Sequence, residues 1–326
     1  MRAWQVPELG EPRDVLTLAE VPDPVPGPGQ VLVRVLGAAA NFPDVLMCRG
    51  GYQVRPPLPF TPGVELCGEV VAAGPGVTGI APGDRLIGGA IGGAFAELTL
   101  MNAASALPAP PGLDDAEAGA FFITYQTGWF GLHRRARLAA GETLLVHAAA
   151  GGVGSGAVQL GKAAGARVIG VAGGEEKAEV ARALGADVVI DRNTQDFVEV
   201  VKEVTEGRGA DVVYDPVGGD TYARSTKCIA FEGRIVVIGF TSGRVPAAAA
   251  NHLLVKNYAV VGLHWGLYRQ RAPELIPECT HRLFELYRQG KIRPHVGRQA
   301  PLAEAVDLLK AVASRQTTGK AVLTVV

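Results

Sequence analysis

Between residues 143 and 262, short apolar segments alternate with segments of helical character, and this alternation constrains the fold more than any other feature. We expect strands at residues 143–147, 167–171, 187–191, 211–215, 234–238 and 258–262. Four helices are expected between them, at residues 154–164, 175–184, 194–205 and 220–229. Such alternation is typical of βαβ units, which build a parallel, doubly wound sheet.

The first 120 residues differ, because they are rich in proline and glycine and show little helical periodicity. Strands are expected at residues 31–35, 68–73 and 85–87, so this part is predicted to be a compact β-rich domain. Two helices, at 273–289 and 302–314, precede a last strand at 321–325 that has no neighbouring βαβ partner. We therefore expect that strand to return to the first domain. The predicted domains are residues 1–121 and residues 122–262, and residues 263–326 are expected to return to the first domain.

The segment from Ala149 to Gly154 matches the pattern G-x-G-x-x-G with alanine in the first place. It directly follows an expected strand and opens an expected helix, which is the context that a dinucleotide-binding turn requires. Gly151 allows the backbone to approach a pyrophosphate, and Gly154 allows the helix to pack closely on the strand. Free amides at the helix N-terminus then bind phosphate oxygens. The alternative is a tight turn without a ligand.

The end of the second expected strand indicates which dinucleotide binds. An NAD site carries Asp or Glu about 20 residues after the first glycine, but this strand ends in Ala172, Gly173 and Gly174. Lys177 follows one helical turn later, and Arg192 follows the third strand. Two cations around an open pocket suit a 2′-phosphate, so the prediction is NADPH rather than NADH. The alternative for Lys177 is a solvated face beside two glutamates.

Charge and side-chain spacing weigh against several other classes of protein. The net charge of −1, without a basic run, disfavours nucleic acid as a partner. The four cysteines have no C-x-x-C spacing and the six histidines are isolated, so no zinc ligand set is visible. The first eight residues lack the apolar core of a signal peptide. We expect a cytoplasmic protein without a metal, and hydride transfer to an electron-poor acceptor such as a quinone or conjugated enone.

Four motifs carry a resemblance that covers nearly the whole chain. They are Asn41-Phe42-Pro43-Asp44 with Gly50-Gly51-Tyr52; the run Pro62 to Gly68; the run His147 to Gly154; and the run Gly233 to Gly239. With them the chain resembles the medium-chain dehydrogenase/reductase superfamily, and within it the zinc-independent NADPH:quinone oxidoreductases, the group that includes zeta-crystallin. Asn41 stands where zinc-dependent relatives carry a ligand cysteine, and Val64 stands where they carry a ligand histidine.

The resemblance implies a GroES-like β-barrel catalytic domain plus a doubly wound Rossmann domain, with NADPH in the cleft between them and a homodimer as the assembly. In the dimer, the strand at 258–262 could pair across a two-fold axis. The implied cofactor contacts are Asn41, Tyr52 and Thr127 at the nicotinamide; Gly151, Gly152, Val153 and Gly154 at the pyrophosphate; Gly173, Gly174, Lys177 and Arg192 at the ribose phosphate; Gly239, Phe240, Leu263, His264 and Trp265 on the other side; and Lys320 at a phosphate or ribose. Relatives usually carry tyrosine where Arg192 stands.

Three functions remain open at the level of sequence. The first is reduction of a quinone, and the second is reduction of a carbon–carbon double bond in an enoyl thioester or alkenal, on the same scaffold. The third is a non-catalytic NADPH-binding or RNA-binding role like that of crystallin relatives. For an enone, Tyr52 is the candidate proton donor, with an aromatic wall or cofactor contact as its alternative. Asn41 is the second candidate catalytic residue, whereas Asp44 is expected to cap a loop.

Overall fold

The computed structural model describes residues 1–325 and divides the chain into two compact units. One unit comprises residues 1–123 and 294–326, and the other comprises residues 124–293. The first division lies two residues from the expected boundary at 121. Among the described residues, no helix is long and apolar enough to cross a membrane.

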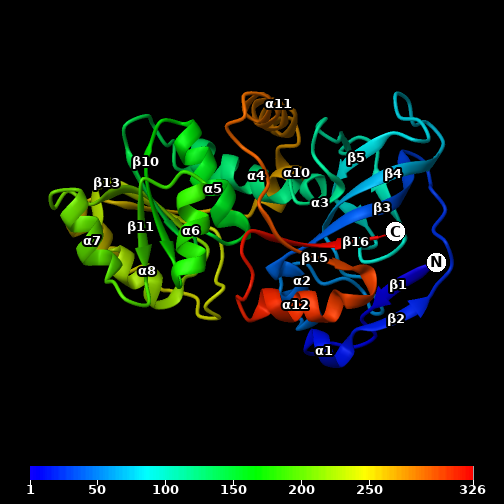
Figure 1. The fold of residues 1–326 in the computed structure, drawn as a ribbon, viewed down its shortest axis with the longest axis horizontal. Coiled ribbons are helices and arrows are strands. Elements are labelled where there is room, and N and C mark those ends of the chain that lie inside the picture. The colour runs from blue at the N-terminus through cyan, green and yellow to red at the C-terminus, as the bar shows by residue number, and fades with distance from the viewer. Residues whose placement is uncertain (326) are drawn as a thin grey trace. The chain divides into compact units, whose positions relative to one another are not determined.

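The second unit is built on a six-stranded parallel sheet (Figure 1). Its strands are β9 (Thr143–His147), β10 (Arg167–Ala172), β11 (Val188–Asp191), β12 (Ala210–Asp215), β13 (Ile229–Val237) and β14 (Ala259–Gly262). Their order in the sheet is β11-β10-β9-β12-β13-β14. Counted along the chain, that is 3-2-1-4-5-6, the order of a doubly wound dinucleotide-binding fold. The predicted parallel sheet is confirmed.

Helices cover both faces of this sheet. They include α5 (Gly152–Ala163), α6 (Glu175–Ala183), α7 (Phe197–Val204) and α8 (Gly219–Ser225). On one face, Gly161 of α5 brings the helix against the side chains of Leu144 and Val168. On the other face, Phe197 of α7 is buried in one cluster with Leu145 of β9. Neighbouring strand residues point to opposite faces, so these all-apolar strands contribute to both layers.

Two boundaries in the second unit differ from the sequence-based expectation. The helix expected at 220–229 ends at Ser225, and Ile229 already begins β13. The β-branched residue pairs with Ala210 of β12, and this sheet contact replaces the last helical turn. The chain also does not return to the first unit at residue 263, because residues up to 293 belong to the second unit.

Side-chain contacts explain why residues 263–293 stay with the second unit. They form α10 (Trp265–Arg271) and α11 (Leu275–Arg288), which follow α4 (Phe122–Trp129), the π-helix η1 (Phe130–Arg135) and α9 (Ala250–Lys256) along the chain. The indole of Trp265 donates to the Gln126 side chain at 3.2 Å. The ring of Tyr268 packs on Phe130 with 4.4 Å between the ring centroids. Both contacts attach α10 to the start of the same unit.

The first unit is mainly antiparallel and is built around an eight-stranded sheet. Its strands are β3 (Gln30–Ala40), β4 (Glu65–Ala73), β5 (Arg85–Gly88), β6 (Ala90–Ile91), β7 (Leu98–Asn102), β8 (Leu107–Pro108), β15 (Val296–Pro301) and β16 (Lys320–Thr324). A separate pair is formed by β1 (Arg2–Gln5) and β2 (Thr17–Glu20). The final strand β16 pairs antiparallel with β3, from Ala321 opposite Ala40 onward. This pairing confirms the expected return of the last strand.

Short helices complete the first unit. They are α1 (Pro12–Val15), α2 (Phe42–Cys48), α3 (Asp115–Gly119), η2 (Leu302–Glu304) and α12 (Ala305–Ala313). Leu308 of α12 and Val45 of α2 are fully buried in one apolar cluster with Val33 of β3. The helix expected at 302–314 is therefore present as η2 followed by α12, and its apolar residues close the core of this unit.

Candidate active site

The turn between β9 and α5 has the geometry of a phosphate-binding turn. Gly151 is the N-cap of α5, and no side chain caps the helix, so the amides of the first helical turn keep no intrahelical partner. A Cβ on Gly154 would lie 2.0 Å from the carbonyl oxygen of Ala148, the residue that leaves β9. Glycine is therefore required there for the helix to start so close to the strand.

Behind this turn, His147 at the end of β9 is buried and its Nε2 lies 2.8 Å from the hydroxyl of Ser225 in α8. Burial, with a smaller contribution from Arg224, lowers the pKa of His147 to about 3. The imidazole is therefore neutral at physiological pH. It connects the strand end to α8.

The loop after β10 leaves space for a cationic side chain. Gly174 has a φ of +87°, a conformation that favours glycine. A Cβ on Gly173 would lie 2.8 Å from Nε of Arg192, so the absence of a side chain at residue 173 makes room for that guanidinium. Lys177 lies in the first turns of α6, directly after this loop. The structure thus brings Gly173, Gly174 and Arg192 together, as the sequence predicted.

One residue near this loop was not predicted. Asp191, the last residue of β11, accepts hydrogen bonds from the amides of Gly174 at 2.8 Å and Asn193 at 2.9 Å. These two bonds lower the pKa of its carboxyl group. The ionised carboxylate therefore fixes both loops at this edge of the sheet. The signal in the sequence is an acidic residue at the end of an expected strand.

The remaining residues of the second unit that were predicted to bind the cofactor lie on α4 and in the segments that follow β13 and β14. Thr127 is buried in α4, one residue after Gln126, which accepts the indole hydrogen bond of Trp265. The amide of Leu263 donates to the carbonyl oxygen of Val237 and so continues the sheet beyond β14. Gly239 and Phe240 lie two and three residues after the end of β13, and Gly218 lacks a side chain where the Phe240 ring approaches it.

In the first unit, Asn41 and Asp44 form a buried capping box at the start of α2. The Asp44 carboxylate accepts the amide of Asn41 at 2.7 Å and the amide of Gly63 at 3.0 Å. Burial raises the pKa of Asp44 to about 7, while the two backbone bonds and the charge of Lys320 act in the opposite direction. Asp44 therefore caps the loop, as expected.

Lys320 on β16 reaches the same place from the other end of the chain. Its ammonium group donates to the Asn41 side-chain oxygen at 2.5 Å and to Glu65 Oε1 at 2.7 Å. The Asn41 amide group donates to Glu65 at 3.0 Å and to the carbonyl oxygen of Ala39 at 3.1 Å. All three polar side chains are buried. The orientation of the Asn41 carboxamide is thus fixed by the protein itself.

Sequence reasoning did not find this Glu65–Lys320 pair, because the two residues are separated by 255 positions. The second carboxylate oxygen of Glu65 accepts the amide of Ile123 at 2.8 Å, so the pair also holds the end of the first segment of this unit. The proposed contact of Lys320 with a cofactor phosphate or ribose stays a prediction. The buried ammonium group is bonded to two polar side chains, so its structural role does not depend on that contact.

Tyr52, the candidate proton donor, is half-buried and packs against the core of the first unit. Burial raises the pKa of its hydroxyl, with a smaller contribution from Asp44. The phenol is therefore protonated throughout the physiological pH range and can donate a proton. Within residues 1–325, no three His, Cys, Asp or Glu side chains are arranged to hold a metal ion.

Comparison with known proteins identifies the family. Residues 27–111 match the alcohol dehydrogenase GroES-like domain, and residues 152–281 match the zinc-binding dehydrogenase family. The quinone oxidoreductase-like protein 2 homolog of Nematostella vectensis is 39% identical over 300 residues, which cover 91% of this chain and 82% of that protein. The chain belongs to the zeta-crystallin-like, quinone oxidoreductase group of the medium-chain dehydrogenase/reductase superfamily.

Solved structures of this superfamily agree with the fold. The quinone oxidoreductase of Escherichia coli, complexed with NADPH, is 33% identical and superposes with a TM-score of 0.91 over 99% of this chain and all of that one. The CurK enoyl reductase is 25% identical, with a TM-score of 0.90 over 100% of this chain and 99% of that one. The first unit is therefore a GroES-like domain and the second a Rossmann domain, and the protein is an oxidoreductase.

Proposed function

We propose that this protein is an NADPH-dependent, metal-free reductase that transfers a hydride to a quinone or a similar electron-poor acceptor. The observation that carries the proposal is a pair of features on the Rossmann sheet that would suit phosphate groups. These are the uncapped start of α5 at Gly151 and the opening at Gly173 that accommodates Arg192. The structurally similar E. coli quinone oxidoreductase was solved with NADPH.

When bound, NADPH supplies the hydride. The residues of this chain would bind and orient it. Amides of the first turn of α5 would donate to the pyrophosphate, and Arg192 with Lys177 would pair with the 2′-phosphate. Asp191 keeps the Gly174 loop fixed through its amide. We also propose that the nicotinamide is contacted by Asn41, Tyr52, Thr127, Phe240, Leu263 and Trp265.

Arg192 provides the most direct test of cofactor choice. We expect Arg192→Gln to raise the KM for NADPH about tenfold or more, because a charged hydrogen bond contributes roughly 1.5–3 kcal/mol. The KM for NADH should change little, because NADH has no 2′-phosphate. Steady-state kinetics with both cofactors measures this, and Arg298→Gln, an exposed arginine on β15, is the matched control. If the parent enzyme prefers NADH, then Lys177 and Arg192 do not bind the 2′-phosphate as proposed.

The acceptor is tested by following NADPH absorbance with 1,4-benzoquinone, a naphthoquinone, a 2-alkenal and crotonyl-coenzyme A. Rapid oxidation with the quinones alone supports the proposed quinone reductase. Reduction of the alkenal or the thioester instead supports the second candidate, a double-bond reductase, which the similarity to the CurK enoyl reductase favours. Tight NADPH binding without oxidation by any acceptor would support a non-catalytic role.

For an enone acceptor, we propose Tyr52 as the group that protonates the α-carbon. Its protonated hydroxyl fits that role. Tyr52→Phe should then lower kcat with the 2-alkenal about 10²-fold or more and leave the dissociation constant for NADPH unchanged. The rate with benzoquinone, measured in parallel, is the internal control, because that acceptor needs no proton donor from the protein. Unchanged alkenal turnover would exclude Tyr52 as the donor.

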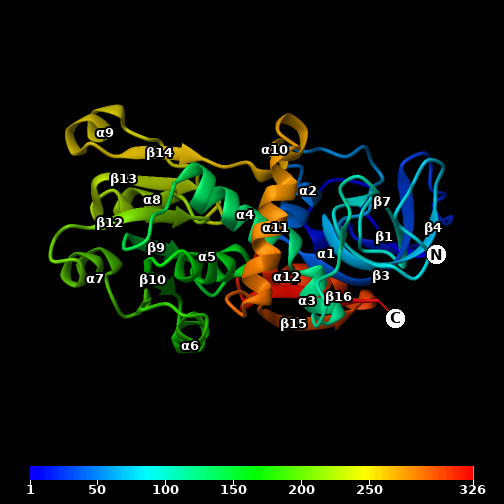
Figure 2. The ribbon, with the colours of Figure 1, turned by 90° about the horizontal axis from the view of Figure 1, so that it is seen from above.

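We further propose that the enzyme is a cytoplasmic homodimer that binds small molecules rather than nucleic acid. The support for the dimer is β14, which lies beside β13 at the edge of the six-stranded sheet (Figure 2). An edge strand has unpaired backbone groups that can pair with a second copy.

A further inference from the structure

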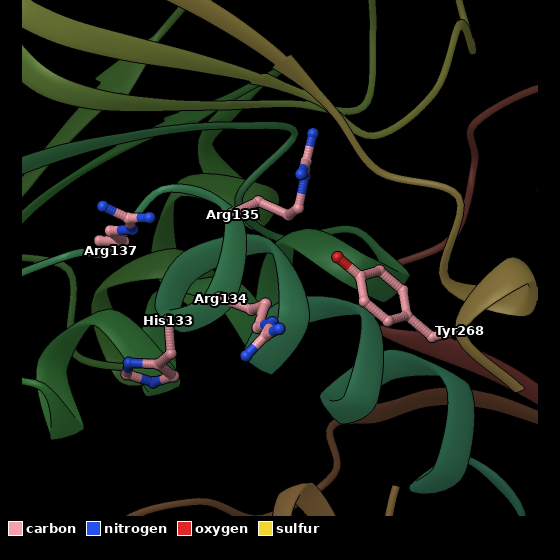
Figure 3. A pocket seen from close by; sticks show the side chains of 5 residues that line it. All are labelled: His133, Arg134, Arg135, Arg137 and Tyr268. Carbon is pink, nitrogen blue, oxygen red and sulfur yellow. The ribbon is translucent and has the colours of Figure 1, made fainter. Parts of the chain in front are cut away.

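A basic pocket lies in the Rossmann unit, and none of its lining residues belongs to the phosphate turn (Figure 3). Its volume is about 410 Å³, and it is lined by His133, Arg134, Arg135, Arg137 and Tyr268. Four of these side chains come from η1 and the residues directly after it, and Tyr268 comes from α10. Pockets that bind small molecules begin at roughly 300 Å³, so this one is large enough for more than a single ion.

An irregular backbone brings the basic residues together. The amide of Ala136 donates to Gly131, and the amide of Leu138 donates to Leu132, so the chain makes wider turns here than an α-helix does. Arg137 has a φ of +52°, a conformation that is unfavourable for arginine. π-Helical turns are rare and often mark functional sites. The unusual turn therefore needs support from its surroundings.

The support comes from Arg234 on β13. Its guanidinium donates to the carbonyl oxygens of Ala136 at 2.8 Å and Arg137 at 3.2 Å, and it is paired with both carboxylate oxygens of Glu142. Glycine at residue 131 allows the same segment to pack closely on β12, because a Cβ there would lie 3.1 Å from the ring of Tyr214. The backbone that carries the basic side chains is thus held in one conformation against the sheet.

The charges in the pocket are not neutralised by the protein. Among the described residues, no carboxylate pairs with Arg134, Arg135 or Arg137, and the one hydrogen bond of an arginine side chain in the pocket runs from Arg135 to the carbonyl oxygen of Gly262. Arg134 and Arg137 are exposed. The Tyr268 hydroxyl likewise has no hydrogen-bond partner in the part of the chain that the structure describes. Arg135 is exposed as well, so all three guanidinium groups are accessible to a ligand that supplies negative charge.

The donors define the ligand. Guanidinium groups and a tyrosine hydroxyl are hydrogen-bond donors, and burial lowers the pKa of His133, so its neutral ring adds an N–H. A ligand that fits this set carries several acceptor oxygens and more than one negative charge, which describes a phosphate group. The remaining volume leaves space for an organic part. We propose that this pocket binds a small organic phosphomonoester, at a site separate from the NADPH site.

The test is a calorimetric titration of the full-length protein with adenosine 5′-monophosphate, with and without saturating NADPH. We expect binding to persist when NADPH occupies the phosphate turn. Arg134→Gln/Arg137→Gln should weaken it about tenfold or more, because two charged contacts are lost. The matched control is Lys291→Gln/Arg298→Gln, which removes two exposed cations elsewhere and should bind as the parent does. Melting temperatures of both double variants check that the fold is intact.

Three results would overturn the proposal. One is that the two double variants bind adenosine 5′-monophosphate with equal affinity. Another is that uncharged adenosine, which lacks the phosphate, binds as tightly as adenosine 5′-monophosphate. The third is inorganic phosphate binding as tightly as the nucleotide, because the organic part would then contribute nothing. NADPH oxidation is measured separately, so an enzyme that fails to reduce any acceptor but binds the phosphomonoester refutes the proposed function and leaves this site standing.

Discussion

Gly154→Ala is expected to lower the affinity for NADPH at least about tenfold and to destabilise the fold by roughly 1–3 kcal/mol. The added methyl carbon would lie 2.0 Å from the carbonyl oxygen of Ala148, a backbone atom that cannot rotate away. The start of α5 must then move outward, and its amides lose their positions for the pyrophosphate. Fluorescence titration with NADPH and thermal unfolding measure the two effects.

Gly262→Ala is the matched control for this substitution. Gly262 ends β14, a Cβ there would meet no atom within 4 Å, and its φ lies outside the range reserved for glycine. Its alanine variant should keep the stability and the NADPH affinity of the parent within about 0.5 kcal/mol. If Gly154→Ala binds NADPH as the parent does, the turn does not hold the pyrophosphate.

Lys320→Met is expected to destabilise the protein by about 3–5 kcal/mol, because it leaves the carboxylate of Glu65 buried without a counterion. The side chains of Lys320 and Glu65 are 5% and 0% exposed. The substitution also frees the Asn41 side-chain oxygen, which now accepts the lysine hydrogen bond. Chemical unfolding measures the free-energy change, and kcat with benzoquinone reports whether the orientation of Asn41 matters for turnover.

Two further variants separate the buried charge from the loss of a lysine in general. Glu65→Gln/Lys320→Met removes both charges and should recover much of the lost stability. Lys202→Met breaks an exposed pair with Glu199 on α7 and should cost at most about 1 kcal/mol. A Lys320→Met protein as stable as the Lys202→Met protein would show that the buried pair has no special structural role.

The sequence alone determined the Rossmann unit almost completely. Apolar strands and amphipathic helices are local patterns, so they located β9 at its observed residues and β10, β11, β12 and β14 to within a residue at each end. The exception is β13, which begins five residues earlier than the expected start at residue 234. The GxGxxG-like turn and the acid-free end of β10 are also local, because a few consecutive residues define each. They led to the proposed phosphate-binding turn and to the opening beside Arg192. Relatives with known structures then confirmed the superfamily.

The tertiary structure decided what depends on residues far apart in the chain. The buried group of Asn41, Glu65 and Lys320 forms because β16 pairs with β3, and no local pattern contains that pairing. The basic pocket likewise needs the π-helical turn, and Arg234 stabilises that turn from another strand. Local sequence fixes periodicity and turns, whereas the burial of a charge and the convergence of distant side chains follow from packing alone.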